Sequence, residues 1–504
     1  MVALPAASAR VPLFTKITFA VGTTAENIAL FAVSSYAFFF YNQVRGLDPT
    51  WTGLALGASL LLDGFSDPII GSISDRTRSK WGRRHPFMFA APIPVVLSLI
   101  AVFNPPEMLS GFWLFLWFTA FVSSMRVCMA VYHTPHLALA AEMTKDFTER
   151  SRVLSWNTLF GQFGTAGVVF VALTFFFHKT EEYPRGLLNP DAYAPFGYAA
   201  GAAVLLLLFV SAWFTRDRIA LMAKLPDDLA PFSPFAFMKD IGAVFTNRNY
   251  VFMLIGMFFI AMTTGIRSGL ALYINTFYWE LTSEHIRWFV LANVAGFFIG
   301  FAVTSWIHTR FGKRFGMTLG CAVVAVAHAI PVTLGIAGVL DADHPWLMHV
   351  LLAAYVLQST FGCIMTISTL SAMGDIADEN ELRIGHRQEG VLYSTRTLFS
   401  KLDTAIGQVI AGLVLTAIAF PEKAVPGQVD ADTLYRLAWV DGPIASTPAV
   451  IAAFFYARYR ISRSKFDETR RLLNERHAAT PTAAVVAEES DVGILGAPPA
   501  GARP

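Results

Sequence analysis

The stretch Asp63-Gly-Phe-Ser-Asp67-Pro68 closes an apolar segment that begins near Thr50, and a basic run through Arg84 follows it. Apart from the two aspartates, the segment is long and apolar enough to span a bilayer as a helix, which places Asp63 near mid-membrane. At a spacing of four residues, both carboxylates share one helix face. Burying both as anions without a partner would cost several kcal/mol, so the pattern predicts a bound cation, a shared proton or a nearby basic side chain.

A structural alternative is that Asp67 satisfies backbone groups freed by Pro68 while Asp63 faces water. We favour the functional interpretation because ionisable residues at this depth usually mark ion or substrate paths.

The composition is typical of a polytopic membrane protein: 55% of the 504 residues are hydrophobic, 15% are charged and 44 are Phe. A net charge of +2, with Lys and Arg concentrated in particular loops, argues against a nucleic-acid partner. The three cysteines lie in apolar segments, where we expect inert packing residues without a disulfide or metal role. They are Cys128, Cys321 and Cys363. Residues 1–15 lack a signal-peptide pattern, so the first span is expected to stay in the mature chain.

Twelve apolar runs of membrane-spanning length predict an all-α membrane protein with twelve transmembrane helices in two six-helix halves. The first six runs cover residues 17–41, 50–73, 87–103, 111–135, 152–178 and 196–214. The second six cover 250–277, 288–308, 317–340, 346–373, 390–420 and 438–457. The expected units are an N-terminal half (1–214), a connector (215–249), a C-terminal half (250–460) and a tail (461–504) without ordered structure.

Lys and Arg gather in the loops after the even-numbered spans, whereas the other loops are sparser in basic residues and often acidic. The positive-inside rule therefore predicts that both termini and the connector lie in the cytoplasm. Two of these loops are also alike, because Trp81-Gly-Arg-Arg84 and Phe311-Gly-Lys-Arg314 occupy the same place in the two halves. Such a repeat is typical of alternating-access carriers, and at this point the chain resembles the major facilitator superfamily.

A closer resemblance rests on three stretches that together span both halves. They are Asp63 to Gly71 with the basic run to Arg83, Glu142-Met-Thr-Lys-Asp-Phe-Thr-Glu-Arg150, and Gly385-His-Arg-Gln-Glu-Gly390 leading to Lys401. These stretches are similar to the glycoside-pentoside-hexuronide:cation symporters, the melibiose permease-like family. The resemblance implies a cation-binding role for Asp63 and Asp67 and a sugar-binding role for Glu26. It also implies that Lys401, in the eleventh span, is linked to the cation region.

Four positions depart from the melibiose permease pattern. Ser66 replaces an asparagine beside the second aspartate, and Ala130 replaces a threonine at the cation. His133 replaces a sugar-binding aspartate, and Asn157 replaces an arginine. The changes at 66 and 130 weaken the case for Na⁺ at Asp63 and Asp67, whereas those at 133 and 157 put a melibiose-like sugar in doubt.

Further candidates come from the residues themselves. Lys401 lies in a long apolar span, so we expect it to pair with Asp63 or Asp67 from the other half, with Asp403 as the local alternative. His133 and His136 share a helix face, but without a third ligand a zinc site is not expected, and His133 is a candidate hydrogen-bonding or titrating group. Trp156 is a candidate apolar face for a sugar ring, although packing is the alternative.

Charged residues at corresponding places after the fourth and tenth spans could form a gate closed by salt bridges between halves. The alternative is that they are solvated loop charges worth little individually. The candidates are Glu142, Asp146, Arg150, Asp375, Asp378 and Arg387.

The predicted function is a secondary symporter that couples H⁺ or Na⁺ to a small sugar-like solute, in a bacterial inner membrane and as a monomer. A carrier of lysolipid or another amphiphile is the alternative. An enzyme is not expected, because the chain lacks the nucleophile-elbow, zinc-protease and phosphate-loop motifs. No cofactor is expected. H⁺ is favoured over Na⁺ because a proton needs only one carboxylate, whereas sodium needs several oxygens.

Overall fold

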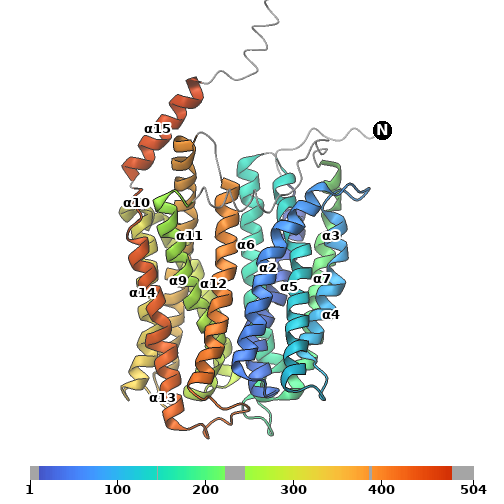
Figure 1. Cartoon of the computed structure of the whole chain (residues 1–504), viewed down its shortest axis with the longest axis vertical. Coiled ribbons are helices and arrows are strands. Elements are labelled where there is room, and N and C mark those ends of the chain that lie inside the picture. Colours follow the sequence, from blue (N-terminus) through green and yellow to red (C-terminus); the bar gives the residue numbers. More distant parts are fainter. Residues whose placement is uncertain (1–10, 145, 222–244, 385–388, 462, 480–504) are drawn as a thin grey trace, which may run out of the picture.

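A computed structural model describes residues 11–144, 146–221, 245–384, 389–461 and 463–479, and within these ranges the chain is helical without strands. The N-terminal helices are α1 (Leu13–Ala32), α2 (Pro49–Arg76), α3 (His85–Ala90), α4 (Pro92–Phe103), α5 (Gly111–Glu142), α6 (Phe147–Val171) and α7 (Tyr193–Phe214). The C-terminal helices are α9 (Arg248–Tyr273), α10 (Ser283–Ile336), α11 (Leu347–Ile384), α12 (Glu389–Ala417), α13 (Ala431–Trp439), α14 (Ala445–Tyr456) and α15 (Arg463–Ala479). Figure 1 shows them as a bundle of roughly parallel rods, with α2 and α12 near its centre.

The predicted spans are confirmed. Among the described residues, 11 helices are long and apolar enough to cross a membrane. One of them, α10, has 54 residues and is interrupted at Gly312, where φ is 83° and ψ is 168°. Only glycine adopts this conformation readily, so the break divides α10 into the eighth and ninth predicted spans. Several spans extend through short π-helical turns, such as Val33–Ala37 after α1 and Val440–Ile444 between α13 and α14.

The sequence repeat has a structural counterpart. Gly82, in the turn after α2, has a φ of 73°, close to that of Gly312. The basic residue after each glycine reaches an acid at the end of a long helix: Arg83 Nη2 lies 2.9 Å from Glu142 Oε1, and Lys313 Nζ lies 2.6 Å from Asp375 Oδ1. Both turns lie at the end of the bundle that carries α15, at the top of Figure 1, which we call the basic end.

Contacts at the opposite end of the bundle, the far end, join the N-terminal to the C-terminal helices. Tyr273 donates a hydrogen bond to Asn42 Oδ1 (2.6 Å), Gln43 Nε2 donates to the Pro421 carbonyl (3.1 Å), and the hydroxyl oxygens of Thr50 and Thr416 lie 2.8 Å apart. α2 and α12 approach so closely here that a Cβ on Gly412 would lie 2.3 Å from the Pro49 carbonyl oxygen. The far end is therefore closed.

The tail differs from its prediction. Residues 463–479 form α15 instead of lacking structure, and residues 480–504 lie outside the described ranges. Thr469 and Leu473, one turn apart, are buried, whereas most other side chains of this helix are exposed. This spacing is that of an amphipathic helix whose narrow apolar face packs on the bundle. This amphipathic spacing was not recognised in the sequence because most residues of the segment are charged or polar.

Glu149 connects the start of α6 to the start of α1. Its Oε1 lies 2.5 Å from Lys16 Nζ and accepts a hydrogen bond from the Val11 N–H at 2.9 Å. The hydrogen bond from Lys16 is the largest of the effects that hold the pKa of Glu149 below its ordinary value. Because the folded-state pKa is lowered, this contribution to stability is complete above the unfolded-state pKa and is lost as the pH falls through the folded-state pKa.

We therefore expect Glu149→Gln to lower the Tm at pH 7 by roughly 1–3 °C, and the difference from the wild type to close as the pH falls below about 4. Thermal unfolding of the purified protein across this pH range measures both effects. Glu468→Gln, an exposed acid of α15, is the control. An equal Tm change in the control, or a difference that persists at low pH, would contradict the assignment.

Candidate functional site

Lys401 of α12 bridges to both aspartates of α2. Its Nζ lies 2.9 Å from Asp63 Oδ2 and 2.6 Å from Asp67 Oδ2. The two helices are close here, since a Cβ on Gly64 would lie in van der Waals contact with Lys401, 3.7 Å from its Cβ. The one-turn spacing of the two acids lets a single ammonium contact both. The structure thus joins residues more than 330 positions apart in sequence, at the junction of the N- and C-terminal helices.

The three charges are held in partial isolation from water. The side chains of Asp63, Asp67 and Lys401 keep 12%, 22% and 22% of their exposure, respectively. Two carboxylates and one ammonium leave a net charge of −1 when all three are ionised. Charges in such surroundings interact strongly because the local dielectric constant is low. The arrangement can therefore take up one further cation without gaining net positive charge.

The hydroxyl groups around the aspartates differ from the sequence expectation in one respect. Ser66 Oγ donates to the Asp63 backbone carbonyl at 3.0 Å, which is bonding within its own helix. Ala130 offers no oxygen, but Thr134, one turn further along α5, places its hydroxyl 3.4 Å from Asp67 Oδ1. Sequence comparison position by position missed Thr134. The i, i+4 spacing from Ala130 is the signal that could have found it.

Glu26 of α1 contacts His133 of α5, so two predicted binding residues from different helices meet. His133 Nδ1 lies 2.8 Å from Glu26 Oε2, and the His133 side chain keeps 34% of its exposure. His136 contacts a different part of α1: its Nε2 donates to the Phe19 carbonyl at 2.9 Å, and its ring stacks on Phe19. No group of three potential metal ligands occurs among the described residues.

Asn157 and Trp156 lie on α6, beside the same part of α1. Thr23 donates a hydrogen bond to Asn157 Oδ1 at 2.6 Å. Trp156 is half-buried, and its ring centre lies 6.0 Å from that of Phe160. Glu26, His133 and Asn157 thus add an acid, an imidazole and an amide to the junctions of α1 with α5 and α6. These groups can donate to and accept from hydroxyl groups.

The acidic gate candidates have partners within their own group of helices. Glu142 accepts from Arg84 Nε at 3.0 Å, and Asp375 pairs with Lys313 as described above. Asp378 Oδ2 lies 3.0 Å from Arg470 Nε of α15.

The other gate candidates lie around α6 and in the loop before α12. Asp146 caps α6 by accepting from the Glu149 N–H at 2.6 Å. Arg150 is exposed in the first turn of that helix, and Arg387 lies outside the described residues.

A second polar cluster, among the C-terminal helices, was not predicted as a site. Arg267 Nη1 donates to Gln358 Oε1 at 2.6 Å, and His328 Nε2 donates to the Asp441 carbonyl at 2.6 Å. Asp441 is 1% exposed, and its Oδ1 has no partner among the described residues. Asp441 lies in an apolar span, which is the sequence signal that could have revealed it.

Asp403 is not a partner of Lys401, although it lies two positions away on α12. It is 1% exposed, and neither carboxylate oxygen has a described hydrogen-bond partner. Residues two apart point to different sides of a helix, which explains why Lys401 faces α2 while Asp403 does not.

Comparisons with known proteins agree with this architecture. The family model described as MFS/sugar transport protein matches residues 18–463. A putative glycoside/cation symporter of Escherichia coli (strain K12) is 23% identical over 94% of this chain and 98% of its own. The sodium-dependent lysophosphatidylcholine symporter 1 of Xenopus tropicalis is 20% identical over 82% of each chain.

Among solved structures, a bacterial homologue of the human lysosomal transporter Spinster is 12% identical and superposes with a TM-score of 0.61. The match covers 93% of this chain and 98% of that one. This likeness concerns the fold alone. Together with the family match over nearly the whole helical bundle, it leads to one conclusion: the chain belongs to the MFS/sugar transport protein family of the major facilitator superfamily.

Proposed function

We propose that this protein is a secondary active transporter that couples H⁺ or Na⁺ to the movement of a small sugar-like solute by alternating access. The observation that carries the proposal is the contact of Lys401 with Asp63 and Asp67. It places an ionisable cluster across the junction of the two helix groups, where it responds to their relative movement. A purely structural ion pair would not need the second carboxylate.

In this mechanism Lys401 and the coupling cation compete for the same carboxylates. With no cation bound, the ammonium neutralises Asp67 and contacts Asp63. Cation binding lowers the attraction between α2 and α12 because it satisfies the carboxylates without Lys401. A bound ion can shift a conformational equilibrium only through such a difference in its affinity for the two states.

H⁺ is the first candidate for the coupling ion, since protonation of one carboxylate needs no further ligands. Na⁺ is the second candidate, and the hydroxyl of Thr134 beside Asp67 is the observation that favours it. The relatives do not decide the matter, because one is named as a glycoside/cation symporter and the other as sodium-dependent.

A glycoside or similar polyhydroxylated solute suits the polar groups on α1, α5 and α6. Glu26, His133 and Asn157 supply donors and acceptors for sugar hydroxyl groups, and Trp156 can cover an apolar face of the ring. A lysolipid is the alternative cargo, as in the Xenopus tropicalis relative. Such a cargo would need an apolar path for an acyl chain beside these groups.

We place the protein in a bacterial inner membrane as a monomer, with the basic end and both termini in the cytoplasm. The far end, closed in this structure, then faces outwards. The charged residues after the fourth and tenth spans act as the cytoplasmic gate, and their present partners within each helix group would exchange for partners across the junction. No enzymatic step is part of this function.

The test uses proteoliposomes in which a proton gradient and a sodium gradient are imposed separately. Labelled glycosides and labelled lysophosphatidylcholine are offered in parallel. We expect glycoside accumulation that follows the proton gradient and collapses with a protonophore. Accumulation that follows sodium and ignores pH would refute the proton assignment, whereas lysolipid transport without glycoside transport would refute the sugar assignment.

A further inference from the structure

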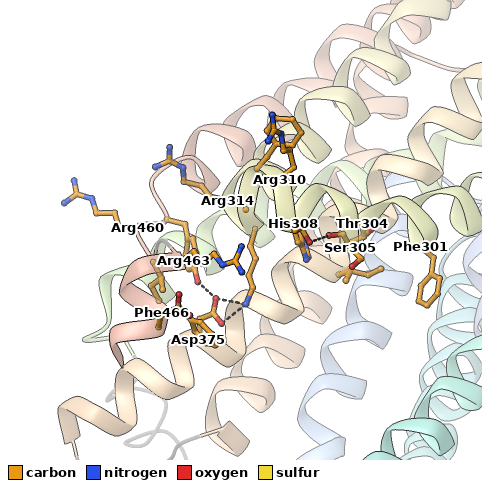
Figure 2. Close-up of a pocket in the computed structure, with 18 of the residues that line it drawn as sticks. Phe301, Thr304, Ser305, His308, Arg310, Arg314, Asp375, Arg460, Arg463 and Phe466 are labelled. Atoms are coloured by element: carbon orange, nitrogen blue, oxygen red, sulfur yellow. Dashed lines mark hydrogen bonds and ion pairs between the residues drawn. The ribbon is translucent and has the colours of Figure 1, made fainter. Parts of the chain in front are cut away.

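A cavity of about 1100 Å³ opens at the basic end, beside the break in α10. Its walls come from α10 on both sides of Gly312, from α11 at Ile367 and Asp375, and from the segment that leads from Tyr459 into α15. Figure 2 shows this cavity in close-up. Neither α2 nor α12 lines it, so the cavity is separate from the Asp63, Asp67 and Lys401 cluster.

The cavity has an excess of positive charge. Four of its arginines take part in no ion pair within the described part of the chain: Arg310, Arg314, Arg460 and Arg463. Lys313, by contrast, is neutralised by Asp375, whose Oδ2 also accepts from Tyr459 at 3.2 Å. Asp467 is the remaining acid of the lining. Guanidinium groups match phosphate oxygens in geometry as well as charge, so the cavity is suited to a phosphate group.

Apolar side chains also line the cavity. Phe301 and Phe311 of α10 line it and are 65% and 51% exposed. Figure 2 shows Phe301 at one side of the view and Arg460 and Arg463 at the other. Trp306, on the same stretch of α10, is 62% exposed, as expected for an aromatic residue at a membrane surface. A ligand that fits has a phosphate at one end and hydrocarbon at the other.

We propose that this cavity binds an anionic phospholipid, with its phosphate among Arg310, Arg314, Arg460 and Arg463 and its acyl chains along Phe301 and Phe311. Basic cavities at the cytoplasmic ends of membrane helices are suited to such headgroups. The lipid would connect both sides of the α10 break to the segment before α15. It therefore holds α15 against the bundle. Free phosphate shares the headgroup chemistry but would leave the aromatic wall unused.

The test compares two double variants of the purified full-length protein that lose equal charge. Arg314→Gln with Arg463→Gln alters the cavity. Lys80→Gln with Arg216→Gln removes two exposed basic residues of the N-terminal helices at the same end. Native mass spectrometry measures binding of phosphatidylglycerol and of phosphatidylcholine from detergent micelles. Inorganic phosphate is offered as the soluble competitor.

We expect the cavity variant to bind phosphatidylglycerol roughly 10- to 30-fold more weakly, since each Lys or Arg near an anionic headgroup contributes about 1 kcal/mol. The control pair should bind like the wild type. Arg314→Lys with Arg463→Lys should keep most of the binding, because the positive charge at both positions is retained. Equal losses in both glutamine pairs, or equal binding of phosphatidylcholine, would overturn the proposal. Complete displacement of the lipid by millimolar phosphate would overturn the lipid assignment in favour of a soluble anion.

Discussion

Asp67→Asn is expected to abolish ion-driven accumulation of the solute while leaving the protein folded. The substitution removes the carboxylate that lies 2.6 Å from Lys401 and leaves Asp63 as the ammonium's one acidic partner in the cluster. A contact to a charged group contributes about 1.5–3 kcal/mol, so its loss should weaken cation binding roughly 10- to 150-fold. Uptake into proteoliposomes with an imposed ion gradient measures the loss.

The matched control for this experiment is Asp403→Asn. It makes the same chemical change at a buried aspartate of α12 that has no described hydrogen-bond partner. We expect normal accumulation, because an amide replaces a carboxyl group that contacts no member of the cluster. Asp63→Asn should behave like Asp67→Asn. Normal accumulation by Asp67→Asn, or an equal loss in Asp403→Asn, would place the coupling site elsewhere.

Gly412→Leu is expected to open the far end of the bundle. Its Cβ would lie 2.3 Å from the Pro49 carbonyl oxygen and 3.3 Å from Gly53 Cα, so α2 and α12 must separate. Overpacking costs about 1–3 kcal/mol, which corresponds to a shift of roughly 5- to 150-fold against the closed far end.

Cross-linking of Thr50→Cys with Thr416→Cys measures this shift in a background without the native cysteines, because the two hydroxyl oxygens lie only 2.8 Å apart. The yield should fall sharply when Gly412→Leu is added. Gly362→Leu is the control, since a Cβ at this glycine of α11 has no neighbour within 4 Å. An unchanged yield in Gly412→Leu would show that the helices do not depend on this contact.

The membrane spans and part of the Asp63, Asp67 and Lys401 cluster could be predicted from the sequence. Apolar runs must be helical in a membrane, so their lengths determine the elements. Unpaired charges are costly in such runs, so the contact of Lys401 with Asp67 could be expected from the sequence. Contacts that depend on the rotation of each helix about its own axis were harder to predict. Thr134 and Asp441 depend on which face of a helix points inwards, and that is decided by packing against neighbours.

The helix α15 in the tail and the cavity beside Gly312 could not be predicted from the hydropathy of the sequence. Hydropathy marks helices that lie in the membrane, but α15 is charged and has a narrow apolar face, so it gave no such signal. The four arginines of the cavity come from two segments about 150 residues apart, and the packing of α14 against α10 brings these segments together. The similarity of the Gly82 and Gly312 turns could be predicted from sequence, whereas the space beside Gly312 could not.

The position of Lys401 on the same chain as its acids has a consequence for the response of the carrier to ion concentration. A tethered ammonium competes at a fixed effective concentration, of millimolar order or above for short connections, which dilution does not lower. The concentration of a free cation must exceed this effective concentration before the cation displaces Lys401 from the carboxylates. In the proposed mechanism, the empty carrier therefore stays charge-compensated in dilute medium, and transport rises only above a threshold that the length and reach of one side chain determine.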